Sequence, residues 1–296
     1  MAISLEFDYH KPKSLKEASR LCAKYKDKAR ILAGGTDLIN WIKEDAITPK
    51  TLIDIKGIPE LKKIKASKNS VFIGANVTFE ELLDSAIIKK RYPLIFEMAK
   101  TVASVGIRNR ATLTGNICAA VPSCDAGPVL LVYDQVEIVA VSQGKTRKIK
   151  IKDWFIGPKK TSLKKNELVK GITIKNPGKC GASYVKLGRY KGEDLAQASV
   201  AVIILPGNKF RVSCGAVGPK PLKALKTEAL LNNNGFNPET LRTAKTRILE
   251  EISPIDDIRA SKEYRNHMMP IMLERGINAA LSRLTGNGPK YGTSFL

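Results

Sequence analysis

The chain has 296 residues, of which 43% are hydrophobic, so it can bury the cores of one large globular domain or two of ordinary size. No run approaches the roughly 18 apolar residues of a membrane-spanning helix, and the start "MAISLEFDYHKPKS" lacks the apolar block of a secretory signal. We therefore expect a cytoplasmic protein without membrane insertion.

The formal net charge of +22 raises the question of a nucleic-acid partner. The basic residues extend from Lys11 to Lys290, without an RNA-recognition aromatic signature, a zinc finger or a basic-helix block. We interpret them as a lysine-rich solvated surface, part of which can face acidic partner subunits, and we predict no nucleic-acid partner.

The five cysteines are scattered and odd in number, which favours reduced thiols over a disulfide framework. Cys118 and Cys124 form the one close pair. Their spacing matches neither a zinc knuckle nor the plant-type iron–sulfur pattern, so the sequence predicts no metal site.

The first half of the chain predicts short strands alternating with capped helices. Ser14 with Glu17, and Thr78 with Glu81, are spaced as capping boxes that open two helices. Strands are expected over 29–33, 51–55 and 70–75, and a further helix over 92–102.

Residues 108–134 are rich in Gly, Pro, Asn and small residues and follow no single period, which predicts irregular but ordered backbone. A hairpin is expected next, over 135–142 and 146–155, with Gly144 near its turn.

The composition changes near 175–181, where we place a boundary between domains 1–176 and 177–296. The second domain predicts three strands and then three helices, with Pro238 at a first helical position and Pro270 as a kink. The strands are expected over 182–189, 197–205 and 209–218, and the helices over 221–233, 237–252 and 261–284. The fold class is α+β.

Two stretches could carry chemistry, and the first is "RILAGGTDLINWIK". Gly34 and Gly35 follow a predicted strand, where glycines allow positive φ and the close approach of a ligand to bare backbone amides. The alternative is an ordinary strand-to-helix turn, with Thr36 or Asp37 as the N-cap. The stretch matches neither GxGxxG nor a Walker loop, which disfavours a standard Rossmann or P-loop site.

The second stretch, "TLTGN" followed by "CAAVPSCDAGP", adds another glycine with polar neighbours. The two stretches could hold one extended, phosphate-bearing ligand from two sides. Neither contains a catalytic triad or a paired acid and base. His10 and His267 are distant in sequence, and we interpret both as structural.

The combination of segments resembles the flavoprotein (medium) subunit of the molybdenum hydroxylases, the xanthine dehydrogenase and carbon monoxide dehydrogenase family. "ILAGGTDLI" resembles the first FAD-binding motif of that family, and "RNRATLTGNICAAVPSCD" is similar to the second. "YVKLGRYKGEDLAQASVAV", "CGAVGPKPLKA" and "DIRASKEYRNHM" resemble later segments of the same subunits, in the same order.

This resemblance implies a vanillyl-alcohol-oxidase-like (PCMH-type) FAD-binding fold with subdomains of about 1–56 and 57–176. A small C-terminal α/β domain with a three-stranded sheet and helices would follow. The implied cofactor is FAD, and the residues that match the family's binding segments are Ile31, Leu32, Ala33, Gly34, Gly35, Thr36, Asp37, Leu38, Val102, Thr112, Gly115, Asn116, Cys118, Ala119, Cys124, Asp125 and Lys186.

The resemblance also implies roles for some of these residues. The backbone amides of 33–36 would bind the pyrophosphate, and Thr112, Gly115 and Asn116 would close the other side. Asp125 would bind the ribityl or a nearby polar part, and Lys186 would lie beside the flavin ring and favour its reduced anion. Without the resemblance, Lys186 is read as an exposed strand residue.

Residues 114, 118 and 124 lie within the second stretch. The family commonly has a glycine where this chain has Thr114, and a β-branched residue at positive φ would cost about 1–3 kcal/mol. The backbone there is therefore either in an ordinary region or shifted. Cys118 and Cys124 are interpreted as buried packing residues rather than redox thiols, because no basic residue flanks them.

The function that follows is a FAD-carrying electron-transfer subunit with no catalytic side chain of its own. A molybdenum-cofactor large subunit would oxidise the substrate, a 2Fe-2S small subunit would relay electrons, and FAD would pass them to NAD⁺ or another acceptor. The alternatives are a free-standing flavin-dependent oxidoreductase acting on a small substrate, and a basic nucleic-acid-binding module.

Overall fold

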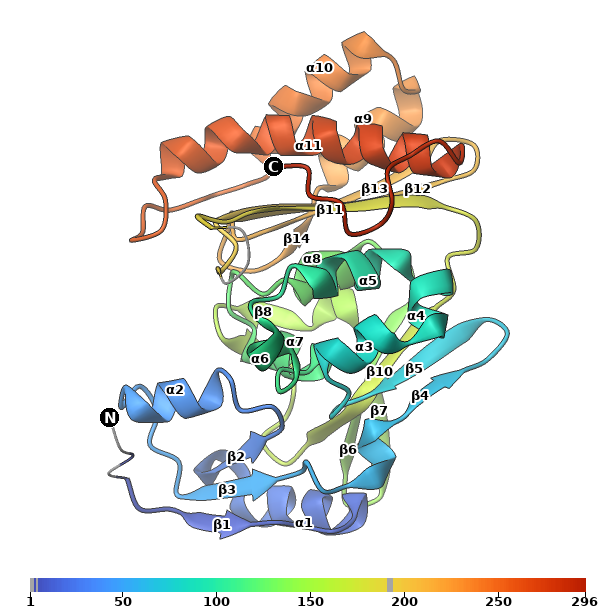
Figure 1. Cartoon of the computed structure of the whole chain (residues 1–296). Helices are drawn as coiled ribbons and strands as arrows, with labels where there is room; N and C mark the ends of the chain where they lie inside the picture. The colour runs from blue at the N-terminus through green and yellow to red at the C-terminus, as the bar shows by residue number, and fades with distance from the viewer. Residues whose placement is uncertain (1–2, 4, 191–193) are drawn as a thin grey trace.

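The structure is a computed structural model that describes residues 3, 5–190 and 194–296. Residues 191–193, inside the quoted segment "YVKLGRYKGEDLAQASVAV", lie outside the described residues. Figure 1 shows three stacked parts: an N-terminal sheet at the bottom, a sheet with helices in the middle, and a C-terminal sheet covered by helices at the top. The predicted α+β class is confirmed.

The N-terminal part is a parallel sheet of order β1-β3-β2. Its elements are β1 (Asp8–His10), α1 (Leu15–Tyr25), β2 (Ala29–Leu32), α2 (Leu38–Lys43) and β3 (Thr51–Asp54). Ser14 caps α1 by accepting a hydrogen bond from the Glu17 amide, whereas the Glu17 carboxylate accepts from the Lys13 amide. The predicted strands and helix are present, but the first predicted capping box is incomplete, because Glu17 bonds the Lys13 amide and not that of the N-cap Ser14.

The middle part contains a five-stranded antiparallel sheet of order β4-β5-β10-β6-β7. Its strands are β4 (Ile64–Ala66), β5 (Ser70–Gly74), β6 (Val136–Ser142), β7 (Lys145–Lys150) and β10 (Leu168–Lys175). A small hairpin of β8 (Phe155–Gly157) and β9 (Lys160–Thr161) follows β7. The predicted hairpin turns at Gly144, which has φ +82°. The central strand β10 was not predicted.

Six short helices cover this sheet: α3 (Phe79–Asp84), α4 (Ala86–Arg91), α5 (Pro93–Lys100), α6 (Val105–Arg108), α7 (Leu113–Ala119) and α8 (Ala126–Leu131). The second capping box is confirmed, since Thr78 and Glu81 exchange both hydrogen bonds. The prediction of irregular backbone over 108–134 is wrong for about half of the stretch, which α7 and α8 occupy. Ala120, in the left-handed conformation, ends α7, and Pro128 falls in the first turn of α8, where proline is tolerated.

The C-terminal part is an antiparallel sheet of order β11-β12-β13-β14. The three predicted strands are β11 (Gly181–Leu187), β12 (Ala198–Leu205) and β13 (Lys209–Gly215), and the two-residue β14 (Leu222–Lys223) extends the sheet at its edge. The helices are α9 (Leu225–Asn234), α10 (Pro238–Arg247) and α11 (Lys262–Leu284). Pro238 is at the start of α10 as predicted, and α11 continues through Pro270 without a break.

Both faces of the C-terminal sheet are buried. Val185 and Val200 belong to the core under α11, whereas Ala182, Tyr184 and Ala201 belong to the core of the middle part. Because side chains alternate along a strand, Lys186 shares the face of Tyr184 and points toward the middle part. This alternation brings two polar side chains of β11 to the boundary between the two parts.

Within the described residues, the structure contains no helix that combines the length and the apolar character needed to cross a membrane.

Candidate functional site

The two glycine-containing stretches meet at Gly34. A methyl group at this position would lie 2.1 Å from the carbonyl oxygen of Arg110 and 3.0 Å from the Cα atom of Ala111. These distances are far shorter than a normal contact, so only glycine lets the two backbones approach this closely. The structure thus brings residues 31–38 against the backbone that leads into Thr112.

Gly35 and the start of α2 have the geometry of a strand-to-helix turn. Gly35 has φ +81°, a conformation that glycine adopts without strain, and its carbonyl accepts the first helical hydrogen bond from Ile39. Asp37 occupies the N-cap position, but its side chain makes no capping hydrogen bond. The Thr36 carbonyl accepts from the Asn40 side chain, and the Asp37 carbonyl accepts from the Trp41 amide. Neither Thr36 nor Asp37 therefore caps α2 with its side chain. The ordinary-turn interpretation required such a cap.

The Asp37 carboxyl is half-buried, and this burial raises its pKa, although the positive charge of Lys159 partly offsets the effect. Lys159 lies in the turn between β8 and β9, and its ammonium is 5.1 Å from the centre of the Trp41 ring on α2. The negative charge of Asp37 contributes to the raised pKa of Cys124. Asp37 therefore lies within electrostatic range of the second stretch.

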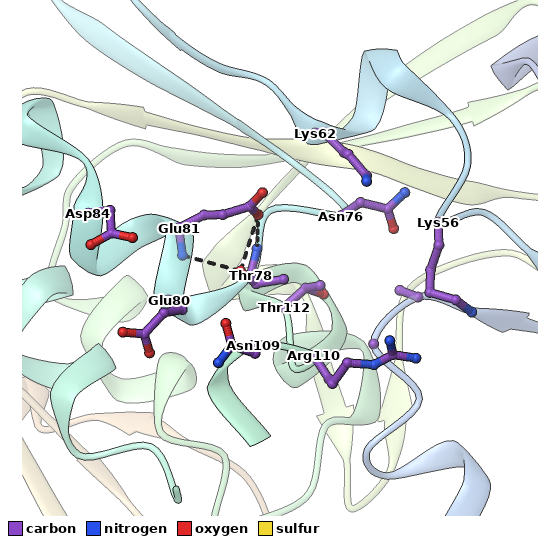
Figure 2. A pocket seen from close by; sticks show the side chains of 12 residues that line it. Lys56, Lys62, Asn76, Thr78, Glu80, Glu81, Asp84, Asn109, Arg110 and Thr112 are labelled. Atoms are coloured by element: carbon purple, nitrogen blue, oxygen red, sulfur yellow. Dashed lines mark hydrogen bonds between the residues drawn. The ribbon is translucent and has the colours of Figure 1, made fainter. Parts of the chain in front are cut away.

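A pocket of about 300 Å³ opens where these segments meet. Three predicted binding residues line it: Ala33, Gly34 and Thr112. Figure 2 shows basic and amide side chains along one side and acidic side chains along the other. Sequence reasoning missed Lys56, Asn76 and Arg110; the first two follow strand ends, and Arg110 lies within the second quoted motif.

Helix α7 holds the second stretch through local hydrogen bonds. Thr112 caps it by accepting from the Gly115 amide at 2.9 Å, and the Asn116 side-chain oxygen accepts from the Ala126 amide at the start of α8. Thr114 is helical, so the ordinary-region alternative is confirmed and no strain arises. Its buried hydroxyl oxygen has no hydrogen-bond partner within the described residues.

Asp125 and Lys186, 61 residues apart in sequence, form a buried ion pair. The Lys186 ammonium is 3.0 Å from Asp125 Oδ2 and also donates to the carbonyl of Thr101 at 2.9 Å. Tyr184, one side chain along the same face of β11, donates its hydroxyl proton to Asp125 Oδ1 at 2.8 Å. Sequence reasoning missed Tyr184, whose signal was its two-residue spacing from Lys186.

The other predicted residues mainly pack. Leu32 and Val102 are buried, Ile31 and Cys118 are partly buried against the apolar cores, and Leu38 and Ala119 are the first and last residues of their helices. Burial raises the pKa of Cys118 and of Cys124 to about 12, which disfavours the reactive thiolate forms. Within the part of the chain that the structure describes, no three His, Cys, Asp or Glu side chains form a metal-binding group.

Comparison with known proteins identifies the family over most of the chain. A family model of the FAD binding domain in molybdopterin dehydrogenase matches residues 5–177, and one of the CO dehydrogenase flavoprotein C-terminal domain matches residues 182–280. The glyceraldehyde dehydrogenase medium chain of Sulfolobus acidocaldarius is 32% identical over 271 residues, which cover 90% of this chain and 95% of that protein.

The carbon monoxide dehydrogenase medium chain of Hydrogenophaga pseudoflava is 32% identical over 284 residues, or 94% of this chain and 98% of that protein. A solved structure of carbon monoxide dehydrogenase from the same organism superposes with a TM-score of 0.91 at 32% identity, covering 96% of this chain and 99% of the matched chain. The chain therefore belongs to the FAD-binding flavoprotein subunits of the molybdenum hydroxylase family, which are oxidoreductase subunits, as the sequence predicted.

Proposed function

We propose that this chain carries electrons through its FAD from a 2Fe-2S partner subunit to NAD⁺ or another acceptor, while a molybdenum-cofactor large subunit oxidises the substrate. The observation that carries this proposal is the end-to-end match to medium chains of carbon monoxide and glyceraldehyde dehydrogenases. A free-standing flavin oxidoreductase is less favoured, because these relatives are subunits of larger enzymes.

The arrangement of the two stretches is suited to FAD. The contact at Gly34 leaves no room for a side chain between them. The adjoining pocket contains the buried Asn76 Oδ1, which has no hydrogen-bond partner among the described residues. The backbone amides of 33–36 would hold the pyrophosphate from one side. Because Asn116 Oδ1 already accepts from Ala126, the Asn116 side-chain nitrogen is the atom free to reach the cofactor.

Lys186 and Asp125 would set the electrostatics at the flavin end. FAD supplies the chemistry that couples one-electron and two-electron transfer, and the protein supplies orientation and charge. The positive charge of Lys186 is partly neutralised by Asp125 at 3.0 Å, so its stabilisation of negative charge depends on that partner. Removal of Lys186 should therefore lower the midpoint potential of bound FAD, and removal of the Asp125 charge should raise it.

The domain division is part of the same proposal: a FAD-binding domain of 1–176, with subdomains of about 1–56 and 57–176, and a C-terminal domain of 177–296. Two features support it. The middle sheet ends with β10 at Lys175, and the C-terminal sheet begins with β11 at Gly181.

The test uses the chain alone and the chain co-purified with its partner subunits. In the complex, anaerobic addition of the enzyme's substrate should bleach iron–sulfur absorbance and then flavin absorbance, whereas the isolated FAD-loaded chain should show no reduction by the same substrate. Photoreduced flavin in the isolated chain should be reoxidised by the physiological acceptor, with NAD⁺ as the first candidate. Substrate turnover by the isolated chain would contradict the proposal and favour the free-standing enzyme.

A further inference from the structure

The Asp125 carboxylate is not used by the helix that it precedes. Asp125 occupies the N-cap position of α8, but its side chain makes no capping hydrogen bond. The first amide of that helix, on Ala126, instead donates to the side-chain oxygen of Asn116 at 3.0 Å. The buried carboxylate therefore keeps both oxygens for donors from the C-terminal sheet, with Tyr184 on Oδ1 and Lys186 on Oδ2.

Tyr184 supplies one of these two donors from a buried position. Burial and the negative charge of Asp125 raise the pKa of the Tyr184 hydroxyl well above its ordinary value, so the hydroxyl keeps its proton at neutral pH. A hydroxyl that donates to a carboxylate forms a charge-assisted hydrogen bond, which is stronger than a bond between neutral groups. Tyr184 therefore stabilises the negative charge of Asp125 and holds one of its oxygens in place.

Residues outside this cluster fix the position of Tyr184. Its amide donates to Glu97 Oε1 at 2.8 Å, and Glu97 also binds Arg283 of α11 and the amide of Gly292 near the C-terminus. Its ring packs in the core of the middle part. Because the amide and the ring are both held, the hydroxyl reaches Asp125 from a defined position, and Tyr184→Phe removes that donor without removing the ring.

The state of Asp125 determines how much of the Lys186 charge remains available. Within the described residues, the Lys186 ammonium uses two of its three donors, on Asp125 Oδ2 and on the carbonyl of Thr101. A carboxylate whose other oxygen is bonded by Tyr184 neutralises the ammonium less than one that faces Lys186 alone. The Tyr184 hydroxyl therefore increases the positive potential that Lys186 exerts on its surroundings.

We propose that Tyr184 is a positioning residue for electron transfer, which acts through Asp125 on the charge that Lys186 presents to the flavin end of FAD. The inference rests on the proposed function, which assigns Asp125 and Lys186 to that end. Tyr184 needs no contact with the cofactor for this role. Loss of its hydroxyl should lower the midpoint potential of bound FAD, whereas loss of the Asp125 charge should raise it.

The test measures the midpoint potential of FAD bound to the full-length chain, by equilibration with redox dyes. For Tyr184→Phe, the ratio of reduced to oxidised FAD at a fixed potential should fall about fivefold, or about 20 mV for a two-electron couple. Tyr92→Phe is the matched control, because it removes a buried hydroxyl of the same core that donates to the Ile174 carbonyl at 3.1 Å. Both variants should lower the melting temperature, but only Tyr184→Phe should change the potential.

A double-mutant cycle with Asp125→Asn separates a positioning role from a structural one. If Tyr184 acts through the Asp125 charge, Tyr184→Phe should leave the potential of the Asp125→Asn chain unchanged, so that the two effects are not additive. An unchanged potential in Tyr184→Phe, or an equal fall in both backgrounds, would overturn the role of Tyr184 while the proposed function stands. If Asp125→Asn and Lys186→Gln also leave the potential unchanged, or if the chain binds no FAD, the proposed function fails together with this inference.

Discussion

Two buried ion pairs join the middle part to the C-terminal part, and they differ in how fully their hydrogen-bonding groups are used. In the first, Glu97 of α5 accepts two bonds from Arg283 of α11 and one each from the amides of Tyr184 and Gly292. The remaining donors of Arg283 bond the carbonyls of Ala182, Pro289 and Lys290. Every donor of the guanidinium is therefore used.

The second pair, Asp125 with Lys186, is less complete. Asp125 accepts one bond at each oxygen, and the Lys186 ammonium uses two of its donors, on Asp125 and on Thr101. Tyr184 connects the pairs, because its amide bonds Glu97 and its hydroxyl bonds Asp125. The Glu97–Arg283 pair is therefore a saturated structural contact, whereas the Lys186 ammonium keeps a donor beyond the two it uses, among residues matched to a cofactor site.

The largest loss of stability should come from breaking the saturated Glu97–Arg283 pair. Glu97→Gln leaves the Arg283 charge buried without a compensating partner, and arginine can neither lose its proton nor leave this stacked position over Tyr291 easily. We expect a loss of about 3–5 kcal/mol in the free energy of unfolding, measured by urea unfolding of the full chain.

Asp125→Asn is the matched comparison for that experiment. It keeps an acceptor for Tyr184, and the flexible Lys186 stem can move the ammonium toward water, so we expect a loss of only about 1–3 kcal/mol. Its effect on the potential of bound FAD should exceed that of Glu97→Gln. Equal stability losses for the two variants would remove the distinction between them.

A smaller effect should come from the contact between the glycine stretches. Gly34→Ala places a methyl group against the Arg110 carbonyl, and rigid backbone must move to relieve the overlap, at about 1–3 kcal/mol. FAD affinity should fall as well, because the two stretches separate. Gly157→Ala is the control: it lies in β8, and an added methyl group there meets nothing within 4 Å. Equal melting temperatures and FAD affinities for both variants would show that the contact is unimportant.

The scaffold was most predictable where a local rule fixed the structure. The capped start of α3 was predicted from the spacing of Thr78 and Glu81, and β11 and β12 were predicted to within two residues at each end. The face of Lys186 then follows from the two-residue period of a strand. The missed strand β10 contains Gly171, which usually indicates a break. Here the glycine is needed because any side chain would lie 2.4 Å from the Ile73 carbonyl of the neighbouring strand. The requirement comes from a strand nearly a hundred residues away, so the local sequence does not reveal it.

The site was predictable for its glycine stretches but not for the residues that complete it. Asn76 acts through a bond to Ile55, which lies 21 residues earlier, and Lys56 and Arg110 reach the pocket from different elements. The helices α7 and α8 were missed for a related reason. The Asn116 side chain satisfies the first amide of α8, a cap that residue composition cannot indicate.

The smallest change in stability should be found at Asp37, a predicted site residue whose buried carboxyl reduces stability instead of supporting it. Burial raises its folded-state pKa above the unfolded value, so the folded chain binds its proton more tightly. Its stabilising contribution is complete below the unfolded pKa, near 4, and is lost as the pH rises through the folded pKa. Asp37→Asn should therefore stabilise the FAD-free chain at pH 7 by less than about 1 kcal/mol, and this gain should vanish at acid pH.

Glu167→Gln should change the free energy of unfolding in the opposite direction when the same measurements are made across pH. Burial opposes ionisation of Glu167, but the hydrogen bonds from Arg147 and the Lys164 amide outweigh it and hold the pKa below its usual value. Its contribution is present above the unfolded pKa and is lost as the pH falls through the folded one, so Glu167→Gln should destabilise the chain at pH 7 and have less effect in acid. If Asp37→Asn instead destabilises the chain at pH 7, as Glu167→Gln should, then Asp37 has a stabilising partner and belongs with the saturated contacts of the scaffold.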